Sequence, residues 1–189
     1  AEGGGIAGSN HIHGMIERCT SGTALDAGGT TINGTVSGGQ TIGGIVGAAT
    51  GSKITGCYNY CTVTSNGDYA GGIVACAGSK KDGAVNTEIA DCANYGSVLS
   101  KGDCAGGIAA QTVYSTTIFN CTNNGSITAD STAAASCGYF VGGIVGGAMG
   151  RTQITGCRNT RSVTAAGSCA GGIVGRMSYS GSGTSVNNC

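Results

Sequence analysis

The sequence is poor in charged residues, and neither sign is in excess. Nine basic and nine acidic residues give a formal net charge of zero, and charged residues make up only 10% of the 189 positions, where about a quarter is usual in a soluble domain. The chain therefore lacks the basic surface with which proteins bind nucleic acids or anionic membranes. We expect no nucleic-acid partner.

The sequence also lacks a long apolar run. No run reaches 18 residues, the length typical of a membrane-spanning helix, so we expect no membrane insertion. The N-terminus, AEGGGIAGSNH, has neither the basic nor the apolar region of a signal peptide, and it has no initiator Met. These features indicate a mature or excised piece of a longer chain.

Proline and tryptophan are absent, whereas glycine is abundant, at 39 residues. Without a G-X-Y period this glycine content excludes collagen, and the regular recurrence of Ile and Val argues against disorder. The glycines form pairs that are followed by aliphatic residues, as in GGIVG and GGIAG. The pairs begin, at steps of 28 to 39 residues, at Gly4, Gly43, Gly71, Gly106, Gly142 and Gly171.

Two further elements follow the glycine pairs, the first in all six repeats and the second in the first five. The first is an aliphatic residue, two spacers and a cysteine, and four repeats place an asparagine two residues after that cysteine. The second is an aliphatic residue six positions after the cysteine, flanked mostly by Ser or Thr, as in Thr62-Val63-Thr64; in the first repeat we assign Leu25 to this place. The cysteines are Cys19, Cys57, Cys92, Cys121, Cys157 and Cys189, and the asparagines are Asn59, Asn94, Asn123 and Asn159.

These elements are short, rich in β-branched residues and bounded by Gly, Asn or Ser, which is typical of strands, and helical periodicity is absent. Three short strands per repeat predict one rung of a parallel β-solenoid. The expected fold is all-β, with residues 1–189 forming a single array of about six three-strand rungs stacked about 4.8 Å apart. The Ile after each glycine pair, the Ile and Cys of each second element and the aliphatic residue of the third strand should point inward.

The pattern GGIVG…ITxCxN…SVT resembles the GLUG repeat of bacterial surface proteins, which include adhesins and the non-catalytic repeat regions of IgA-peptidase-like proteins. The likeness runs from Gly4 to Cys189, and it is clearest in the repeats that start at Gly43, Gly71, Gly106 and Gly142. The first repeat departs from it, with Ser21 in place of the Asn. The resemblance implies an extracellular, surface-exposed solenoid stalk or adhesive segment, without catalytic residues to carry over.

The glycine pairs could instead be phosphate-binding loops, but their spacing does not fit that chemistry. A Walker loop needs G-x-x-x-x-G-K-S/T, and a dinucleotide site needs G-x-G-x-x-G followed by a helix; neither is present. We interpret the pairs as structural corners, where glycine makes a positive φ accessible and lets stacked backbones approach closely. The ladder asparagines are likewise predicted to be structural, stacked at a turn where Asn tolerates left-handed geometry.

The 11 cysteines fall into two sets, and their odd number leaves at least one thiol unpaired or bonded to another chain. The six ladder cysteines are predicted to be mostly buried free thiols, because direct in-register stacking strains a disulfide torsion. The others are Cys61, Cys76, Cys104, Cys137 and Cys169, among which a bridge remains open. No second C-x-x-C-like pair accompanies Cys57 and Cys61, so we expect no metal site and no cofactor.

The remaining chemistry-bearing residues do not form a recognisable catalytic set. His11 and His13 would share one side of a strand, as half of a metal site, but without a third His in the chain we expect a loop at the open end of the stack. The acidic residues scatter over different registers, and Asp68 and Asp103 lie near glycine pairs without a regular companion. Because glycosidases need two carboxyl groups about 5–10 Å apart and no pair stands out, we predict that the chain is not an enzyme.

Two surface features keep alternatives open. Tyr60 and Tyr95 share a register, three residues after the ladder Cys, and tyrosine rings can stack on sugars. The Ser and Thr residues beside the third strand form a row that is interrupted at Leu99, and a regular hydroxyl row on a flat face can order water and bind ice. A carbohydrate-binding or carbohydrate-active β-helix and an ice-binding solenoid are therefore the alternative functions.

The expected function is a non-catalytic cell-surface repeat segment that acts in adhesion or as a stalk or spacer, with a host glycan or protein as its ligand. The chain starts three residues before a glycine pair and ends on a ladder cysteine, without visible polar caps. Because terminal solenoid rungs need covering, we expect each end to stack on flanking repeats, on another domain, or on a further copy in a filament.

Overall fold

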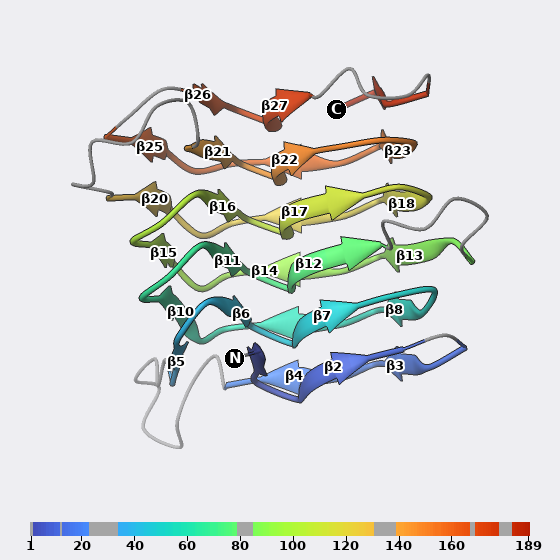
Figure 1. The fold of residues 1–189 in the computed structure, drawn as a ribbon, viewed down its shortest axis with the longest axis horizontal. Helices are drawn as coiled ribbons and strands as arrows, with labels where there is room; N and C mark the ends of the chain where they lie inside the picture. Colours follow the sequence, from blue (N-terminus) through green and yellow to red (C-terminus); the bar gives the residue numbers. More distant parts are fainter. Residues whose placement is uncertain are drawn as a thin grey trace.

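The computed structural model describes residues 2–11, 13–22, 34–78, 85–130, 139–166, 169–177 and 183–189. The regular elements in these ranges are β-strands, and no helix in this part of the chain is long and apolar enough to cross a membrane. Strands of successive repeats pair in parallel, so each turn of the chain lies on the previous one, from the N-terminal rung at the bottom of Figure 1 (blue) to the C-terminal rung at the top (red). The predicted parallel β-solenoid is confirmed.

A complete rung has five short strands, not the three that we expected. The turn at the glycine pair divides the first predicted strand in two, and a left-handed turn before the ladder cysteine divides the second. The five resulting sheets, named A to E in chain order, run along the stack. The first two flank the glycine pairs. Sheet A contains β1 (Glu2–Gly4), β6 (Thr41–Gly43), β11 (Tyr69–Gly71), β16 (Cys104–Gly106), β21 (Phe140–Gly142) and β26 (Cys169–Gly171); sheet B contains β2 (Ala7–Asn10), β7 (Val46–Ala49), β12 (Val74–Gly78), β17 (Ala109–Val113), β22 (Val145–Ala148) and β27 (Val174–Met177).

The other three sheets carry the remaining sequence elements. Sheet C holds the aliphatic residue that precedes each ladder cysteine, sheet D the ladder asparagine, and sheet E the Ser/Thr-flanked strand. Sheet C contains β3 (Met15–Glu17), β8 (Lys53–Thr55), β13 (Thr87–Ala90), β18 (Thr116–Phe119), β23 (Thr152–Thr155) and β28 (Ser185–Asn187); sheet D contains β4 (Thr20–Ser21), β9 (Tyr58–Asn59), β14 (Ala93–Asn94), β19 (Thr122–Asn123) and β24 (Arg158–Asn159); sheet E contains β5 (Thr35–Gly38), β10 (Thr62–Ser65), β15 (Val98–Ser100), β20 (Ile127–Ala129) and β25 (Val163–Ala165).

The first rung corrects one assignment. Leu25 lies outside the described residues, and the place that we gave it in sheet E belongs to Val36, which pairs with Val63. Val36 lies 17 residues after Cys19, whereas the equivalent residue lies six after the ladder cysteine in the next four rungs, so the extra residues of the first repeat precede its fifth strand. Thr35 and Ser37, which flank Val36, match the Ser/Thr-flanked pattern of the other rungs.

The turn between sheets C and D holds the left-handed residues of the rung. In each of the six rungs, the residue before the ladder cysteine has a φ between 52° and 63°. Glycine and asparagine adopt this conformation at low cost, whereas other side chains do so with strain. The six residues are Arg18, Gly56, Asp91, Asn120, Gly156 and Asn188. Our prediction of positive φ at the glycine pairs and at the ladder asparagines is therefore wrong.

Two separate hydrophobic cores run the length of the stack. The larger lies between sheets B and C and contains the Ile after each glycine pair, as in Ile73, together with the Ile and Cys of the second element, as in Ile89 and Cys92. The smaller lies between sheets A and E and contains the third-strand residues Val63, Val98 and Ile127. These are the inward residues that the sequence predicts. In Figure 1, sheets B and C form the right half of the stack, and sheets A and E the left half.

The ladder asparagines stand between the two cores. Asn59, Asn94 and Asn123 are fully buried; each donates one amide hydrogen bond to the Asn of the next rung and another to the carbonyl two residues ahead in its own rung, at 2.8–2.9 Å. The predicted asparagine ladder is confirmed, but its residues lie in extended strands. In the first rung, Ser21 occupies the position that pairs with Asn59.

The second glycine of the four central pairs packs directly against this ladder. A Cβ on Gly72 would collide with the carbonyl oxygen of Gly107 in the next rung and with the side-chain amide of Asn94 in its own rung, and Gly44, Gly107 and Gly143 are placed equivalently. Close approach thus explains these glycines. The contact narrows each rung at its middle and separates the two cores.

Candidate functional site on the sheet D face

Two columns of outward side chains cover sheet D. The ladder asparagine points inward, so the residues immediately before and after it point outward, since strand side chains alternate. The first column pairs Thr20, Tyr58, Ala93, Thr122 and Arg158 along the stack. The second, one position after each asparagine, contains Tyr60, Tyr95, Asn124 and Thr160.

The N-terminal half of this face is aromatic. The rings of Tyr60 and Tyr95 are stacked, with centroids 4.8 Å apart and planes inclined by 6°, so the shared register that the sequence predicts places them in contact. Tyr58 is 41% exposed and Tyr95 is 44% exposed, whereas Ala93, outward in the same column as Tyr58, is only 8% exposed. The small Ala93 side chain therefore lies below the level of the bulky rings around it.

The C-terminal half of the face is polar and cationic. The Thr160 hydroxyl donates to the Asn124 carbonyl oxygen at 2.8 Å, so the NH₂ group of Asn124 remains a donor toward solvent. Arg158 is exposed, and no carboxylate among the described residues forms an ion pair with it. Neither column contains an acidic residue; Asp91, the closest one along the chain, sits in the left-handed turn before Cys92. The face therefore combines exposed rings, hydrogen-bonding groups and an uncompensated cation.

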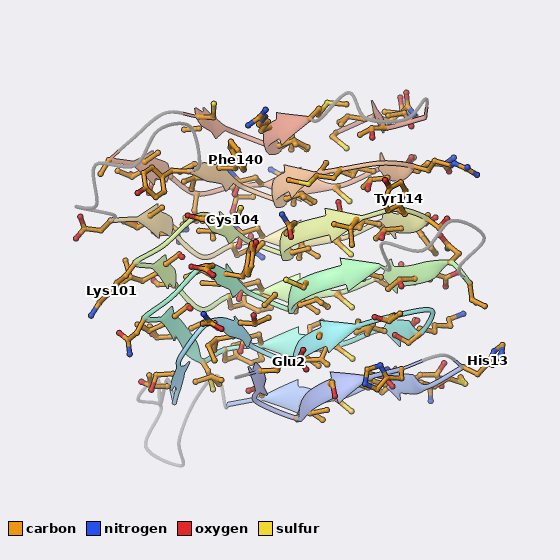
Figure 2. All side chains as sticks on the ribbon, viewed as in Figure 1. Glu2, His13, Lys101, Cys104, Tyr114 and Phe140 are labelled. Atoms are coloured by element: carbon orange, nitrogen blue, oxygen red, sulfur yellow. The ribbon has the colours of Figure 1, made fainter. Side chains whose placement is uncertain are left out.

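The histidines lie elsewhere, and not on a strand. His11 follows the end of β2, and His13 sits in a turn with φ 63°, where its N–H donates to the Gly51 carbonyl. His13 borders an open depression of about 480 Å³ that is also lined by Met15, Lys53 and Glu88. Figure 2 shows His13 at the outer edge of the N-terminal rung, which agrees with the predicted end loop.

The depression beside His13 is closed on one side by an ion pair. Lys53 Nζ lies 3.1 Å from Glu88 Oε1, so these two charges compensate each other. Within the described ranges, no three His, Cys, Asp or Glu side chains are arranged to hold a metal ion. The depression therefore combines this ion pair with the exposed apolar side chains of Met15 and Val85.

Asp68 and Asp103, each three residues before a glycine pair, lie on adjacent rungs. Cys104 donates its backbone N–H to the Asp68 carbonyl, so the two aspartates occupy equivalent places before sheet A. Burial, and secondarily the charge of Asp68, raises the pKa of Asp103.

The cysteines are mostly buried thiols. The six ladder cysteines are free, as are Cys61, Cys104 and Cys169, whereas Cys137 lies outside the described residues. Hydrogen bonds with the Cys157 and Cys92 thiols, together with burial, raise the pKa of Cys121. Such protonated thiols behave as small apolar side chains.

Cys104 belongs to a small outer cluster between sheets A and B. It pairs in register with Phe140, which lies on the next rung in Figure 2, and burial raises the pKa of Cys104 to about 12. Phe140 pairs in turn with Cys169. Cys104 and Cys169, each two residues before a glycine pair, thus share a register, but the ring of Phe140 occupies the rung between them, so they cannot bond to each other.

The hydroxyl face of sheet E is more regular than the sequence suggested, because Thr35 and Ser37 extend it to the first rung. Nine of its ten outward positions carry a hydroxyl, and none of these nine side chains is hydrogen-bonded to another described residue. The exception is Leu99. The nine are Thr35, Ser37, Thr62, Thr64, Ser97, Ser126, Thr128, Ser162 and Thr164.

Sequence reasoning recognised the tyrosine register but missed Arg158. The signal was present, because Arg158 and Tyr58 both directly follow a ladder cysteine. Residues at the same distance from that cysteine lie in one column of the solenoid, so the composition of the sheet D face can be read from this offset.

Comparison of the chain with protein-family models, with curated proteins and with solved structures found no match.

Proposed function

We propose that this chain is a non-catalytic repeat segment of the bacterial cell surface, which acts in adhesion or as a structural stalk. The asparagine ladder carries the proposal, because it links consecutive rungs by buried side-chain hydrogen bonds at 2.8 Å in addition to the backbone pairing. Such a continuous bonded stack makes a stiff rod whose outward residues are displayed in columns. The resemblance of GGIVG…ITxCxN…SVT to the GLUG repeat supports the same function and an extracellular location.

Bead retention separates an adhesin from an inert stalk. Beads coated with the purified chain are passed over a printed glycan array and over immobilised host extracellular proteins, and detachment under flow is measured. An adhesive segment holds the beads on a defined subset of spots. Retention no greater than that of albumin-coated beads on every spot excludes adhesion under this proposal and leaves the stalk role.

We further propose that the terminal rungs stack on rungs of the same kind, in flanking sequence or in a second copy. Asn159 has its carbonyl bond to Arg161 but, among the described residues, no acceptor for its second N–H, whereas each ladder Asn below it has both. A Cβ on Gly172, unlike one on Gly72, would meet no atom within 4 Å among the described residues. Electron microscopy of the concentrated chain tests self-stacking: rods of variable length support it, and uniform single particles contradict it.

The hydroxyl face of sheet E favours ice binding as a second candidate function. Its two columns repeat at the rung spacing of about 4.8 Å, contain no charge, and leave their hydroxyls available to water. Thermal hysteresis of the purified chain is the measurement. Leu99→Thr, which completes the array, is expected to increase the hysteresis, and Thr128→Tyr to abolish it; absence of hysteresis in both the native chain and Leu99→Thr excludes this function.

A further inference from the structure

We propose that the sheet D face binds an acidic oligosaccharide, laid along the solenoid axis from the tyrosines to Arg158. The inference deepens the adhesive function and rests on it. It combines the exposed rings of Tyr58 and Tyr95, the second of which is stacked on Tyr60, with a cation on the same sheet that no described carboxylate neutralises.

The aromatic half supplies contact area for a sugar ring. Tyr rings offer an apolar face and a hydroxyl that forms hydrogen bonds, which suits a ligand whose own surface alternates between C–H and O–H groups. The stack of Tyr60 on Tyr95 holds both rings in place before a ligand arrives, so less side-chain entropy is lost on binding.

The polar half of the face sets the orientation of the oligosaccharide and favours one that carries a carboxylate. Thr122 and the NH₂ group of Asn124 can hydrogen-bond sugar hydroxyls, and Arg158 presents a planar fork of donors that matches a carboxylate. Tyr58 and Arg158 are three rungs apart in one column, which is about 14 Å at the rung spacing. A single sugar cannot span that length, so the ligand is a short chain whose carboxylate lies over Arg158.

The test measures binding of trigalacturonate to the whole chain by isothermal titration calorimetry, with the methyl-esterified trimer as the uncharged control ligand. Tyr95→Ala and Arg158→Gln are each expected to weaken trigalacturonate binding about tenfold, the equivalent of about 1.4 kcal/mol. Tyr95→Phe keeps the ring and retains most of the affinity. Lys101→Gln removes an exposed cation that follows β15, at the left edge of the stack in Figure 2, and leaves the affinity unchanged.

Three results overturn the assignment. The first is an affinity that changes less than twofold in both Tyr95→Ala and Arg158→Gln while circular dichroism shows them folded. The second is equal binding of the methyl ester, and the third is equal binding of polyaspartate, which indicates a plain anion site. Tyr58→Ala, at an exposed ring outside the stack, provides a second aromatic test if Tyr95→Ala fails to fold.

Bead retention distinguishes failure of this site from failure of adhesion. If beads carrying Tyr95→Ala/Arg158→Gln adhere to the array as well as native beads do, the adhesive function stands and the sheet D assignment is wrong. If native beads adhere to nothing, adhesion itself is wrong, whatever the calorimetry shows.

Discussion

The same substitution at two equivalent glycines should have opposite effects on stability. Gly72 and Gly172 are both the second glycine of a pair, but only Gly72 is covered by a following rung. In Gly72→Ala the new Cβ would collide with the Gly107 carbonyl oxygen and with the Asn94 side chain. In Gly172→Ala the Cβ meets no atom of the described residues within 4 Å, and the φ of Gly172 lies outside the left-handed region.

The magnitudes follow from what must move. Overpacking a close-packed site costs about 1–3 kcal/mol. Displacing Asn94 also weakens three hydrogen bonds of 2.8 Å, to Asn59, Gly96 and Asn123, each worth about 0.5–1.5 kcal/mol. We therefore expect Gly72→Ala to lower the free energy of unfolding by about 2–4 kcal/mol. In the unstacked single chain, Gly172→Ala should raise it by about 0.4–1 kcal/mol, because alanine restricts the unfolded chain.

Urea unfolding followed by far-ultraviolet circular dichroism measures both effects, and a third variant tests the cause. If Asn94 is the group that Gly72→Ala displaces, then Gly72→Ala/Asn94→Ala should be less destabilised than the sum of the two single changes. Equal effects at Gly72 and Gly172, or strict additivity with Asn94, would refute the contact between glycine pair and ladder as the reason for the motif.

Three further outcomes can be measured on the same material. The folded-state pKa of Asp103 is raised, so above about pH 3.8 the native state keeps a proton that the unfolded state has lost, and the free energy of unfolding falls as the pH rises through the folded-state pKa. The urea midpoint should therefore fall over this pH range, and it should fall less in Asp68→Asn. The same fall of the midpoint with pH in both proteins contradicts the carboxylate pair. Arg18→Gly removes a left-handed arginine, φ 52°, and should raise the free energy of unfolding by about 1 kcal/mol; a loss of stability contradicts the strain. Iodoacetamide should modify the exposed thiol of Cys189 in the folded chain and that of Cys121 only after unfolding, as read by mass spectrometry; early labelling of Cys121 contradicts its burial.

The solenoid and its ladders could be predicted because, in stacked repeats, the distance of a residue from a repeated marker in the sequence determines its place in the rung. Residues at the same distance from a ladder cysteine share a column, so Ile54, Ile89 and Asn94 could be placed before any strand was assigned. The five-strand rung could not be predicted in this way, because strands of two or three residues are too short to show their own periodicity. The left-handed turn did leave a signal, since Gly or Asn precedes four of the six ladder cysteines.

The first repeat shows where counting fails. An insertion shifts every later position in its rung, and a count from Cys19 cannot locate it, so Leu25 was given a place that belongs to Val36. The flanking residues were the better guide, because Thr35-Val36-Ser37 repeats the hydroxyl–aliphatic–hydroxyl order of the other rungs. Arg158 was missed because β24 consists of Arg158 and Asn159 alone. Such a short strand shows no alternation of its own, so only the inward position of Asn159 marks Arg158 as outward.

The narrow middle of each rung leaves only the outer surface of the stack for binding a ligand. Where Gly72 meets Asn94, the two walls touch, and the cores on either side are filled by Ile, Val, Ala and Cys side chains. No ligand can enter such an interior without unpacking the ladder, so recognition must use the outside of the stack. There, side chains recur about every 4.8 Å along each column. Such a surface suits an extended ligand that contacts several rungs at once, and under our proposal for sheet D the change from tyrosine at rung two to arginine at rung five sets the direction of that ligand.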